Sequence, residues 1–201
     1  MLYQVGRYKD RETYLAQSLE VTDTLEKMVQ ELLAISRLDA PGYTCKKSRL
    51  NLSKLVYDRL AAYEDLFMQK ALTVEYAISP DAFILGDSQQ LQKVLDNLLG
   101  NAAAYSGAGN HIVVNLWEDA EKVCLTIENT GTHIPDADIP KLFEAFYRVD
   151  PSRSRQTGGT GLGLYIVKTI LDLHGAAVKI ENSVQGVIVY VQFQESAYIS
   201  T

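Results

Sequence analysis

The stretch Gln156–Ile166, QTGGTGLGLYI, decides the fold prediction. Four glycines within six residues lead directly into an apolar segment that we expect to form a helix over residues 161–173. Glycines let phosphate approach main-chain N–H groups, and a helix N-terminus adds partial positive charge. The stretch is no Walker A loop, since no Gly-Lys-[Ser/Thr] follows, and no dinucleotide-binding fingerprint, since it follows a polar loop instead of a strand. It predicts an anion-binding loop; the alternative is a glycine-rich turn.

Three arginines lie just before this stretch. Arg148, Arg153 and Arg155 are spaced through RVDPSRSR, residues 148–155. Guanidinium groups bind anionic oxygens well, so these side chains predict a cationic flap over phosphates. Residues 150–158 carry few apolar side chains, and we expect this lid to be mobile without ligand.

A second pattern is a pair of asparagines on a predicted helix. Asn97 and Asn101 are four residues apart, so both amides leave one face while Leu95, Leu98 and Leu99 face the core. Two amide oxygens suit Mg²⁺, which accepts few protein ligands when phosphates and waters complete its octahedron. The alternative is a pair of solvated or capping side chains.

A third pattern follows a predicted strand. Residues 128–135, ENTGTHIP, place polar side chains and a glycine turn at the strand end, where they are suited to line a base pocket; the alternative is a plain turn. His133 has no Ser or Cys nucleophile context, and His111 and His174 are equally isolated. Three scattered histidines predict no metal site.

The composition is that of an ordinary globular chain. It has 201 residues, 47% of them hydrophobic, and a formal net charge of −6. This balance disfavours general nucleic-acid binding, which needs a basic excess. Cys45 and Cys124 cannot build a disulfide framework, and Cys124 is predicted as a small core residue. No stretch reaches the roughly 18 apolar residues of a membrane span.

The remaining periodicities predict alternating helices and strands. Asn51 is expected to cap a helix that ends near residue 70, and Asp87, with Gln90 three residues later, to start another in a capping-box-like arrangement. Alternation predicts strands at residues 72–78, 82–85, 111–117, 122–129, 177–181 and 187–193, the last two as a hairpin. The sum is an α/β sandwich, a mixed sheet with helices on one face.

The first forty residues differ from the rest. A heptad-like apolar stripe runs from Tyr14 to Ile35 and is widened by Leu15, Leu19, Val29 and Leu33. So wide a stripe predicts a multi-helix bundle. We favour packing against another molecule over packing on the body of the same chain, because a lone helix would leave a large apolar area exposed. Residues 41–50 begin with Pro-Gly and predict a linker.

The order of these patterns resembles the N, F and two G boxes of sensor histidine kinases: Asn97 and Asn101, then Asn129-x-Gly131, then FEAFYR at residues 143–148, then Gly159-x-Gly161-x-Gly163. Their Bergerat ATP-binding fold is shared with gyrase B, the Hsp90 chaperones and MutL. The resemblance runs from about residue 50 to residue 194, and residues 32–39, LLAISRLD, resemble the end of the second helix of that family's dimerisation and phosphotransfer bundle. Several stretches look closest to the VanS-type sensors of vancomycin resistance.

The resemblance implies that ATP and Mg²⁺ bind. It places Asn97 and Asn101 at the metal, and Arg148 with them among the catalytic residues. Asn129 and Gly131 would read adenine, and the rings of Phe143 and Phe146 would be buried to pin the lid. The implied nucleotide-binding residues are Asn97, Asn101, Tyr105, Asn129, Gly131, Ile134, Phe146, Arg153, Arg155, Gly159, Thr160, Gly161, Leu162 and Gly163.

The chain departs from the family pattern at several positions. Asn129 stands where the family usually has Asp, Ala104 where it often has Lys or Arg, and His133 where a second glycine is common. Hydrolysing relatives have a water-activating Glu at the position of Asn97, and an amide cannot take that proton, which favours phosphoryl transfer to a side chain. No histidine precedes His111, so we expect the phosphoacceptor helix to lie outside this chain.

The resemblance thus implies an α/β, Bergerat-type two-layer sandwich preceded by one helix of a dimerisation bundle. The implied domains are residues 1–40, the second bundle helix; 41–50, a linker; 51–195, the catalytic ATP-binding domain; and 196–201, a tail.

The implied activity is transfer of the ATP γ-phosphoryl group to a bundle histidine missing from this chain, and then to a response regulator, with control of glycopeptide resistance as the implied output. The parent would be a homodimer in the cell membrane. This chain would be its cytoplasmic domain, joined to the membrane only through missing N-terminal segments and binding no nucleic acid. The alternatives are a non-catalytic nucleotide-binding regulatory module and a Bergerat-fold ATPase.

Overall fold

The computed structural model describes residues 11–119, 122–149 and 159–194. Five strands form a mixed sheet in the order β2-β4-β5-β7-β6. Strand β2 (Thr73–Ile78) is parallel to β4 (His111–Asp119), and the pairings that add β5 (Lys122–Thr130), β7 (Gly186–Gln194) and β6 (Ala177–Asn182) are antiparallel.

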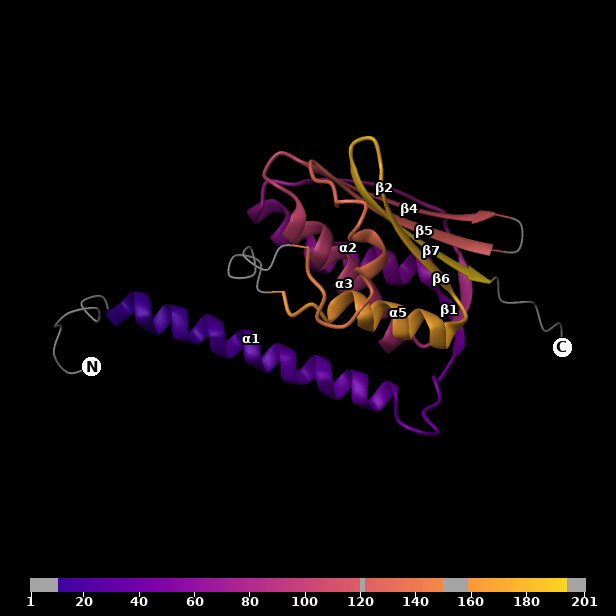
Figure 1. The fold of residues 1–201 in the computed structure, drawn as a ribbon. Helices are drawn as coiled ribbons and strands as arrows, with labels where there is room; N and C mark the ends of the chain where they lie inside the picture. Colours follow the sequence, from indigo (N-terminus) through magenta and orange to yellow (C-terminus); the bar gives the residue numbers. More distant parts are fainter. Residues whose placement is uncertain (1–10, 120–121, 150–158, 195–201) are drawn as a thin grey trace.

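Three helices cover one face of this sheet (Figure 1): α2 (Leu52–Gln69), α3 (Ser88–Tyr105) and α5 (Gly163–His174). The predicted two-layer α/β sandwich, with helices on one face of a mixed sheet, is confirmed.

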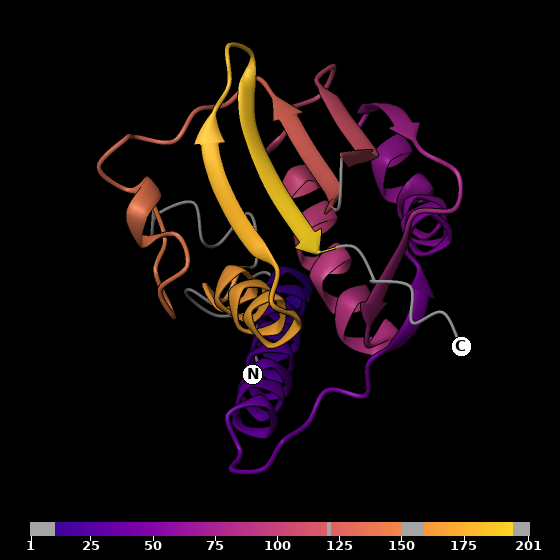
Figure 2. The same ribbon diagram turned by 90° about the vertical axis from the view of Figure 1, so that its right-hand side faces the viewer.

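The core lies between the two layers. Alternate residues of the central strands turn their side chains to the helices, as the period of a strand requires, and are almost fully buried: Ile112, Val114 and Leu116 on β4, and Val123, Leu125 and Ile127 on β5. They meet Leu91, Leu98 and Leu99 of α3 and Ile166, Val167 and Ile170 of α5. Burying each large aliphatic side chain stabilises the fold by roughly 1.5–3 kcal/mol. Figure 2 shows these helices packed beneath the strands.

Both predicted helix starts are confirmed. The Asn51 Oδ1 accepts a hydrogen bond from Lys54 N at 2.8 Å, and the Asp87 Oδ1 accepts from Gln89 N and Gln90 N. The capping box also predicts that the Gln90 side chain accepts a hydrogen bond from Asp87 N, and this part of the prediction is wrong. Asp87 N donates to His174 instead, and the Gln90 amide donates to the Tyr43 hydroxyl.

The strands on either side of residues 79–81 belong to different sheets. Strand β3 (Phe83–Gly86) pairs with β1 (Ser48–Asn51), which includes part of the segment predicted as a linker. Ser53 on α2 holds the turn between the two strands. Its hydroxyl donates to Ser79 O at 2.6 Å and accepts from Ala82 N at 3.0 Å. This turn is therefore bound to α2, and it leads the chain away from β2.

Helix α1 (Arg11–Leu38) confirms the predicted N-terminal helix and lies beside the helical layer (Figure 1). Met28, Ile35 and Leu38 pack against the core of the same chain. The rest of the apolar stripe remains exposed, including Leu15, Leu19, Val21, Leu25, Val29 and Leu33. Packing of this face against another molecule stays a prediction. Within the described ranges, every helix is too short or too polar to cross a lipid bilayer.

Cys124 and His174 both lie outside the site. Cys124 is buried, which confirms the prediction of a small core residue. His174 joins the end of α5 to the start of α3: its Nδ1 lies 2.7 Å from Ile170 O, and its Nε2 accepts from Asp87 N at 3.0 Å. The ring is therefore neutral, with its proton on Nδ1.

We expect this link to make stability dependent on pH. Burial lowers the pKa of His174 below its ordinary value of 6.5, against smaller contributions from the Ile170 carbonyl and Asp87 that raise it. Because the folded pKa is depressed, the stabilisation is complete above the unfolded pKa of about 6.5 and is lost as the pH falls through the folded pKa. Urea unfolding at about pH 7.5 and about pH 5.5 should show a smaller difference in His174→Gln than in the natural chain. An equal difference in the two would contradict this.

Candidate functional site

A cavity of about 230 Å³ opens between α3, the end of β5 and the glycine-rich segment. It brings together residues from all of the sequence patterns, although these are spread along the chain from Asn97 to Gly163. The predicted site residues that line it are Asn97, Asn101, Tyr105, Asn129, Ile134, Arg148, Gly159, Thr160, Gly161 and Gly163. The predicted residues Gly131, Phe146 and Leu162 do not line it.

The two asparagines of α3 face the cavity from one side. Asn97 Nδ2 donates to Lys93 O at 2.8 Å, which fixes the amide and turns its oxygen toward the start of α5. A Cβ at Gly163 would lie 2.6 Å from this oxygen. Gly163 is therefore a glycine because the Asn97 amide occupies the space where a side chain would start.

The donor set at this face fits Mg²⁺. Asn97 and Asn101 both line the cavity and supply neutral amide oxygens, which suit a cation whose other ligands are phosphate oxygens and water. The described ranges contain no group of three or more His, Cys, Asp or Glu side chains that could hold a metal ion. The amides thus fit a metal that arrives with a phosphate ligand.

Asn129 and Gly131 have different roles at the end of β5. The Asn129 side chain is 8% exposed and lines the cavity, and its Nδ2 has no hydrogen-bond partner among the described residues. Gly131 has a φ of +82°, and a Cβ there would lie 2.2 Å from Asn110 Nδ2. Its role is to make the turn, since only glycine adopts this backbone without strain.

The loop after Gly131 is held by residues that the sequence patterns did not reveal. Asn182, at the end of β6, accepts from Ile134 N at 2.9 Å and donates to Ile134 O at 2.7 Å. His133 is exposed, and its Nε2 lies 3.1 Å from Ser183 O. These contacts position Ile134 at the cavity. No periodicity or spacing could have indicated Asn182, because its partner lies 48 residues away.

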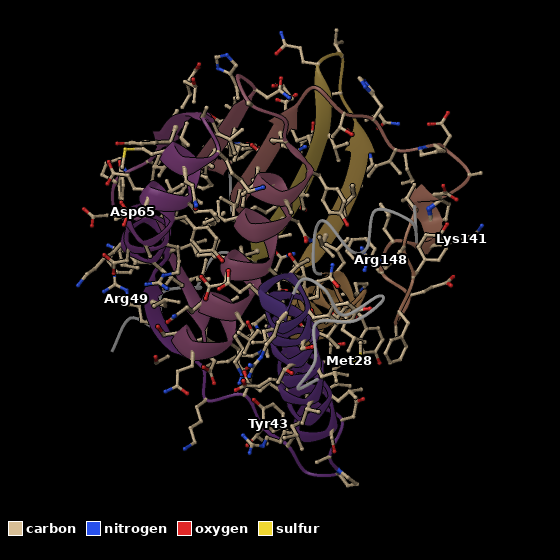
Figure 3. All side chains as sticks on the ribbon, turned by 90° about the vertical axis from the view of Figure 1, so that its left-hand side faces the viewer. Met28, Tyr43, Arg49, Asp65, Lys141 and Arg148 are labelled. Atoms are coloured by element: carbon tan, nitrogen blue, oxygen red, sulfur yellow. The ribbon has the colours of Figure 1, made fainter. Side chains whose placement is uncertain are left out.

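The segment from the 3₁₀ helix η2 (Ile139–Lys141) to Val149 forms another wall. The Tyr147 hydroxyl donates to Asp138 Oδ1 at 2.6 Å, and this bond raises the pKa of Tyr147 to about 12. Arg148 Nη1 donates to Gly159 O. Arg148 thus points toward the domain, whereas Lys141 points outward (Figure 3).

The burial expected for the two phenylalanines is only partly found. Phe143 is half-buried, but Phe146 is 56% exposed, so its ring does not pin the lid by burial. What joins Phe146 to the glycine-rich segment is its backbone, which has a φ of +65° and donates from N to Gly161 O at 3.0 Å.

The glycine-rich segment carries one buried polar side chain at the cavity. Thr160 Oγ1 accepts from Leu162 N at 3.2 Å and donates to Glu31 of α1. Leu162 itself is fully buried in the core, so only its main chain is available to a ligand. Arg153, Arg155 and the predicted mobile lid lie outside the described residues.

The cavity also has walls that sequence reasoning missed. Lys27 and Glu31 reach it from α1, although their helix carried no phosphate-binding signal. Thr132 and His133 belong to the stretch of residues 128–135 that was expected to line a base pocket, and they do line the cavity. The other unpredicted residues have mostly apolar side chains whose place follows only from the tertiary fold: Leu98, Ala102, Ile127, Leu142, Tyr147, Val149, Leu164, Ile180, Val187 and Val189. The predicted Ala104 departure leaves no basic side chain at that turn of α3.

The sequence matches the family described as "Histidine kinase-, DNA gyrase B-, and HSP90-like ATPase" over residues 86–197. Sensor histidine kinase CusS of Escherichia coli is 35% identical over 185 residues, which cover 92% of this chain and 38% of that protein. Sensor protein VanSB of Enterococcus faecalis is 32% identical over 193 residues, which cover 95% of this chain and 43% of that protein. The chain therefore spans less than half the length of these relatives.

Solved structures have the same fold. The catalytic domain of histidine kinase ThkA matches with a TM-score of 0.68 and 25% identity, over 75% of this chain and 96% of that chain. ThkA in complex with the response regulator protein TrrA matches with a TM-score of 0.79 and 21% identity, over 98% of this chain and 55% of that chain.

Proposed function

The chain belongs to the family of histidine kinase-, DNA gyrase B- and HSP90-like ATPases, and from this premise we propose that it works as the catalytic part of a two-component sensor histidine kinase. It would bind ATP with Mg²⁺ and present the γ-phosphoryl group to a histidine on a helical bundle. A response regulator would then accept the group. The presence of α1 supports a division into a bundle helix, a connection that includes β1, and an ATP-binding domain.

The observation that carries this proposal is the chemistry of the α3 face. Asn97 and Asn101 face the cavity, and the Asn97 amide is held by Lys93 O. Among the described residues that line the cavity, the one carboxylate is Glu31 of α1, which accepts from Thr160. An amide binds a metal but cannot deprotonate water, which favours transfer to an acceptor over hydrolysis.

Each part of the site has a proposed role. Asn129 and the loop held by Asn182 would bind the base, and Tyr105 would lie along the nucleotide. The Gly159–Gly163 segment would bound the phosphates, with Arg148 fixing Gly159 by its hydrogen bond. Bound Mg²⁺ would draw charge from the phosphate oxygens.

The similarity of this chain to sensor kinases is not confined to the VanS type. CusS and VanSB match this chain at 35% and 32% identity, so neither kind of sensor is favoured. We therefore propose no link to glycopeptide resistance in particular. We also propose that the kinase works as a homodimer at the membrane. The exposed apolar stripe of α1 supports the homodimer.

The isolated chain should bind ATP yet neither release phosphate steadily nor label itself. Transfer needs a nucleophile within roughly 3–3.5 Å of phosphorus. His111 pairs with Glu75 at 3.0 Å, His174 is held at the far end of α5, and His133 is tied to Ser183 beside the base. Incubation with ATP carrying a labelled γ-phosphate tests this. Acid-labile label on any of these histidines, or continuous phosphate release, would favour another function.

A further inference from the structure

The main chain at Asn129 is fixed by its neighbours in the sheet. Asn129 pairs with Ile112 on β4 and with Val187 on β7. On the β7 side the strands lie so close that a Cβ at Gly186 would be 2.0 Å from Asn129 O. The Cα of Asn129 therefore has little freedom to move, and adaptation to a ligand is left to the side chain.

The amide of Asn129, by contrast, makes no side-chain hydrogen bond with the described residues that would fix which end faces the cavity. The side chain is more than nine-tenths buried and lines the cavity, and its Nδ2 has no hydrogen-bond partner among the described residues. The nearest cavity-lining positions along the sheet, Ile127 and Val187, are apolar. The two ends of an amide have nearly the same shape, so a half-turn about Cβ–Cγ exchanges donor and acceptor at little steric cost.

We propose that Asn129 determines which purine this site accepts, and that it accepts both 6-amino and 6-oxo purines. This proposal rests on the proposed function, in which Asn129 faces the edge of the base. The Asn129 Nδ2 atom is itself buried, so one end of the amide faces the base at a time. Toward adenine the amide oxygen would accept from the 6-amino group, and after a half-turn the amide nitrogen would donate to the 6-oxo group of hypoxanthine.

A carboxylate at this position would behave differently. An ionised Asp has only acceptors, so it pairs with a 6-amino group and leaves a 6-oxo group facing another acceptor. A site built to hydrogen-bond one group rejects an analogue that leaves buried polar atoms unpaired. The departure from Asp to Asn therefore changes the selectivity of the site as well as its charge.

The test compares ATP with ITP, which differ only at C6 and N1 of the base. Calorimetric titration of the full chain with each nucleotide and Mg²⁺ should give dissociation constants within about threefold of one another. In Asn129→Asp the preference for ATP should rise to about tenfold or more. Asn115→Asp makes the same chemical change on the open face of the sheet, where Asn115 lies 3.4 Å from Thr126 Oγ1, and should keep the ratio of the natural chain.

The possible outcomes distinguish a failure of this inference from a failure of the proposed function. If the natural chain binds ATP but binds ITP more than about tenfold less tightly, the amide is fixed and the inference is wrong. An unchanged ratio in a folded Asn129→Asp chain would also overturn it. If that variant does not fold, the ratio in the natural chain decides alone. Absence of binding by either nucleotide would instead remove the proposed function, and this inference with it.

Discussion

The Asn101→Ala chain is expected to bind ATP with the same affinity whether Mg²⁺ is present or absent. In the natural chain we expect Mg²⁺ to tighten ATP binding, because Asn101 lines the cavity one turn after Asn97 and both amides serve one face of α3. A lost charge-assisted contact of this kind should cost about 1.5–3 kcal/mol, which is roughly a tenfold to hundredfold loss in affinity for the magnesium complex. Transfer of the γ-phosphoryl group should fall at least as far.

Asn115→Ala is the matched control for this change. Asn115 lies on β4 among residues that alternate away from the core, and within the described ranges its side chain makes one long hydrogen bond, of 3.4 Å from Nδ2 to Thr126 Oγ1. The control should keep the magnesium dependence of the natural chain. Calorimetric titration of ATP with and without Mg²⁺ measures both variants. A magnesium dependence that survives in Asn101→Ala would show that the metal is held elsewhere.

Gly161→Ala should disable the site through the backbone. Gly161 has a φ of +78°, and a Cβ there would lie 2.8 Å from the main-chain carbon of Phe146. The two residues are also joined by the Phe146 N–H, which donates to Gly161 O at 3.0 Å. The Phe146 main chain cannot easily move away from the added methyl group, because it is itself in the left-handed region with a φ of +65°. Moving the segments apart would open the cavity wall, and we expect ATP affinity to fall about tenfold or more, a loss of at least about 1.4 kcal/mol in binding.

Gly175→Ala separates backbone strain from the clash. Gly175 ends α5 with a φ of +70°, close to that of Gly161, but a Cβ there would meet nothing within 4 Å. This control should lose roughly 1 kcal/mol of stability to urea, the usual penalty for a left-handed residue, and keep its ATP affinity. If both variants lost ATP affinity equally, strain alone would explain the effect and the contact with Phe146 would be unimportant.

Local chemistry explains why so much of the fold was predictable. Asn51 and Asp87 start α2 and α3 because their side chains satisfy helical N–H groups, and this signal is visible within four residues. The alternation of apolar residues on β4 and β5 is also a local signal, because each strand turns every second side chain toward the helices. The five-stranded sheet with helices on one face followed from those elements.

What failed depends on contacts between distant parts of the chain. Strand β1 exists because β3 pairs with it, and nothing local distinguishes its four residues from a linker. Phe146 was expected to be buried because its side chain is large and apolar, yet it is the main chain that makes its contact with Gly161. Asn182 reaches Ile134 across 48 residues. The resemblance implied that Leu162 binds nucleotide; its side chain lies in the core, so any such contact is left to its main chain.

The departures at Ala104 and Asn129 have unequal structural consequences. Ala104 removes a basic side chain from α3, while Lys27 of α1 lines the same cavity. Asn129 keeps the position of the usual Asp but exchanges two acceptors for one donor and one acceptor. If the site binds nucleotide as proposed, the first departure would change the charge around the phosphates, whereas the second would change the surface that the base meets.

Phosphorylation in trans shows directly whether this chain transfers the γ-phosphoryl group of ATP to a histidine. The chain is mixed with a separately made helical bundle of a sensor histidine kinase that carries a phosphoacceptor histidine, together with Mg²⁺ and ATP labelled on the γ-phosphate. We expect acid-labile label on that histidine, none when the histidine is replaced, and none with Asn101→Ala. An unlabelled bundle in the presence of a chain that demonstrably binds ATP would contradict it, because the chain would then bind nucleotide without transferring phosphate.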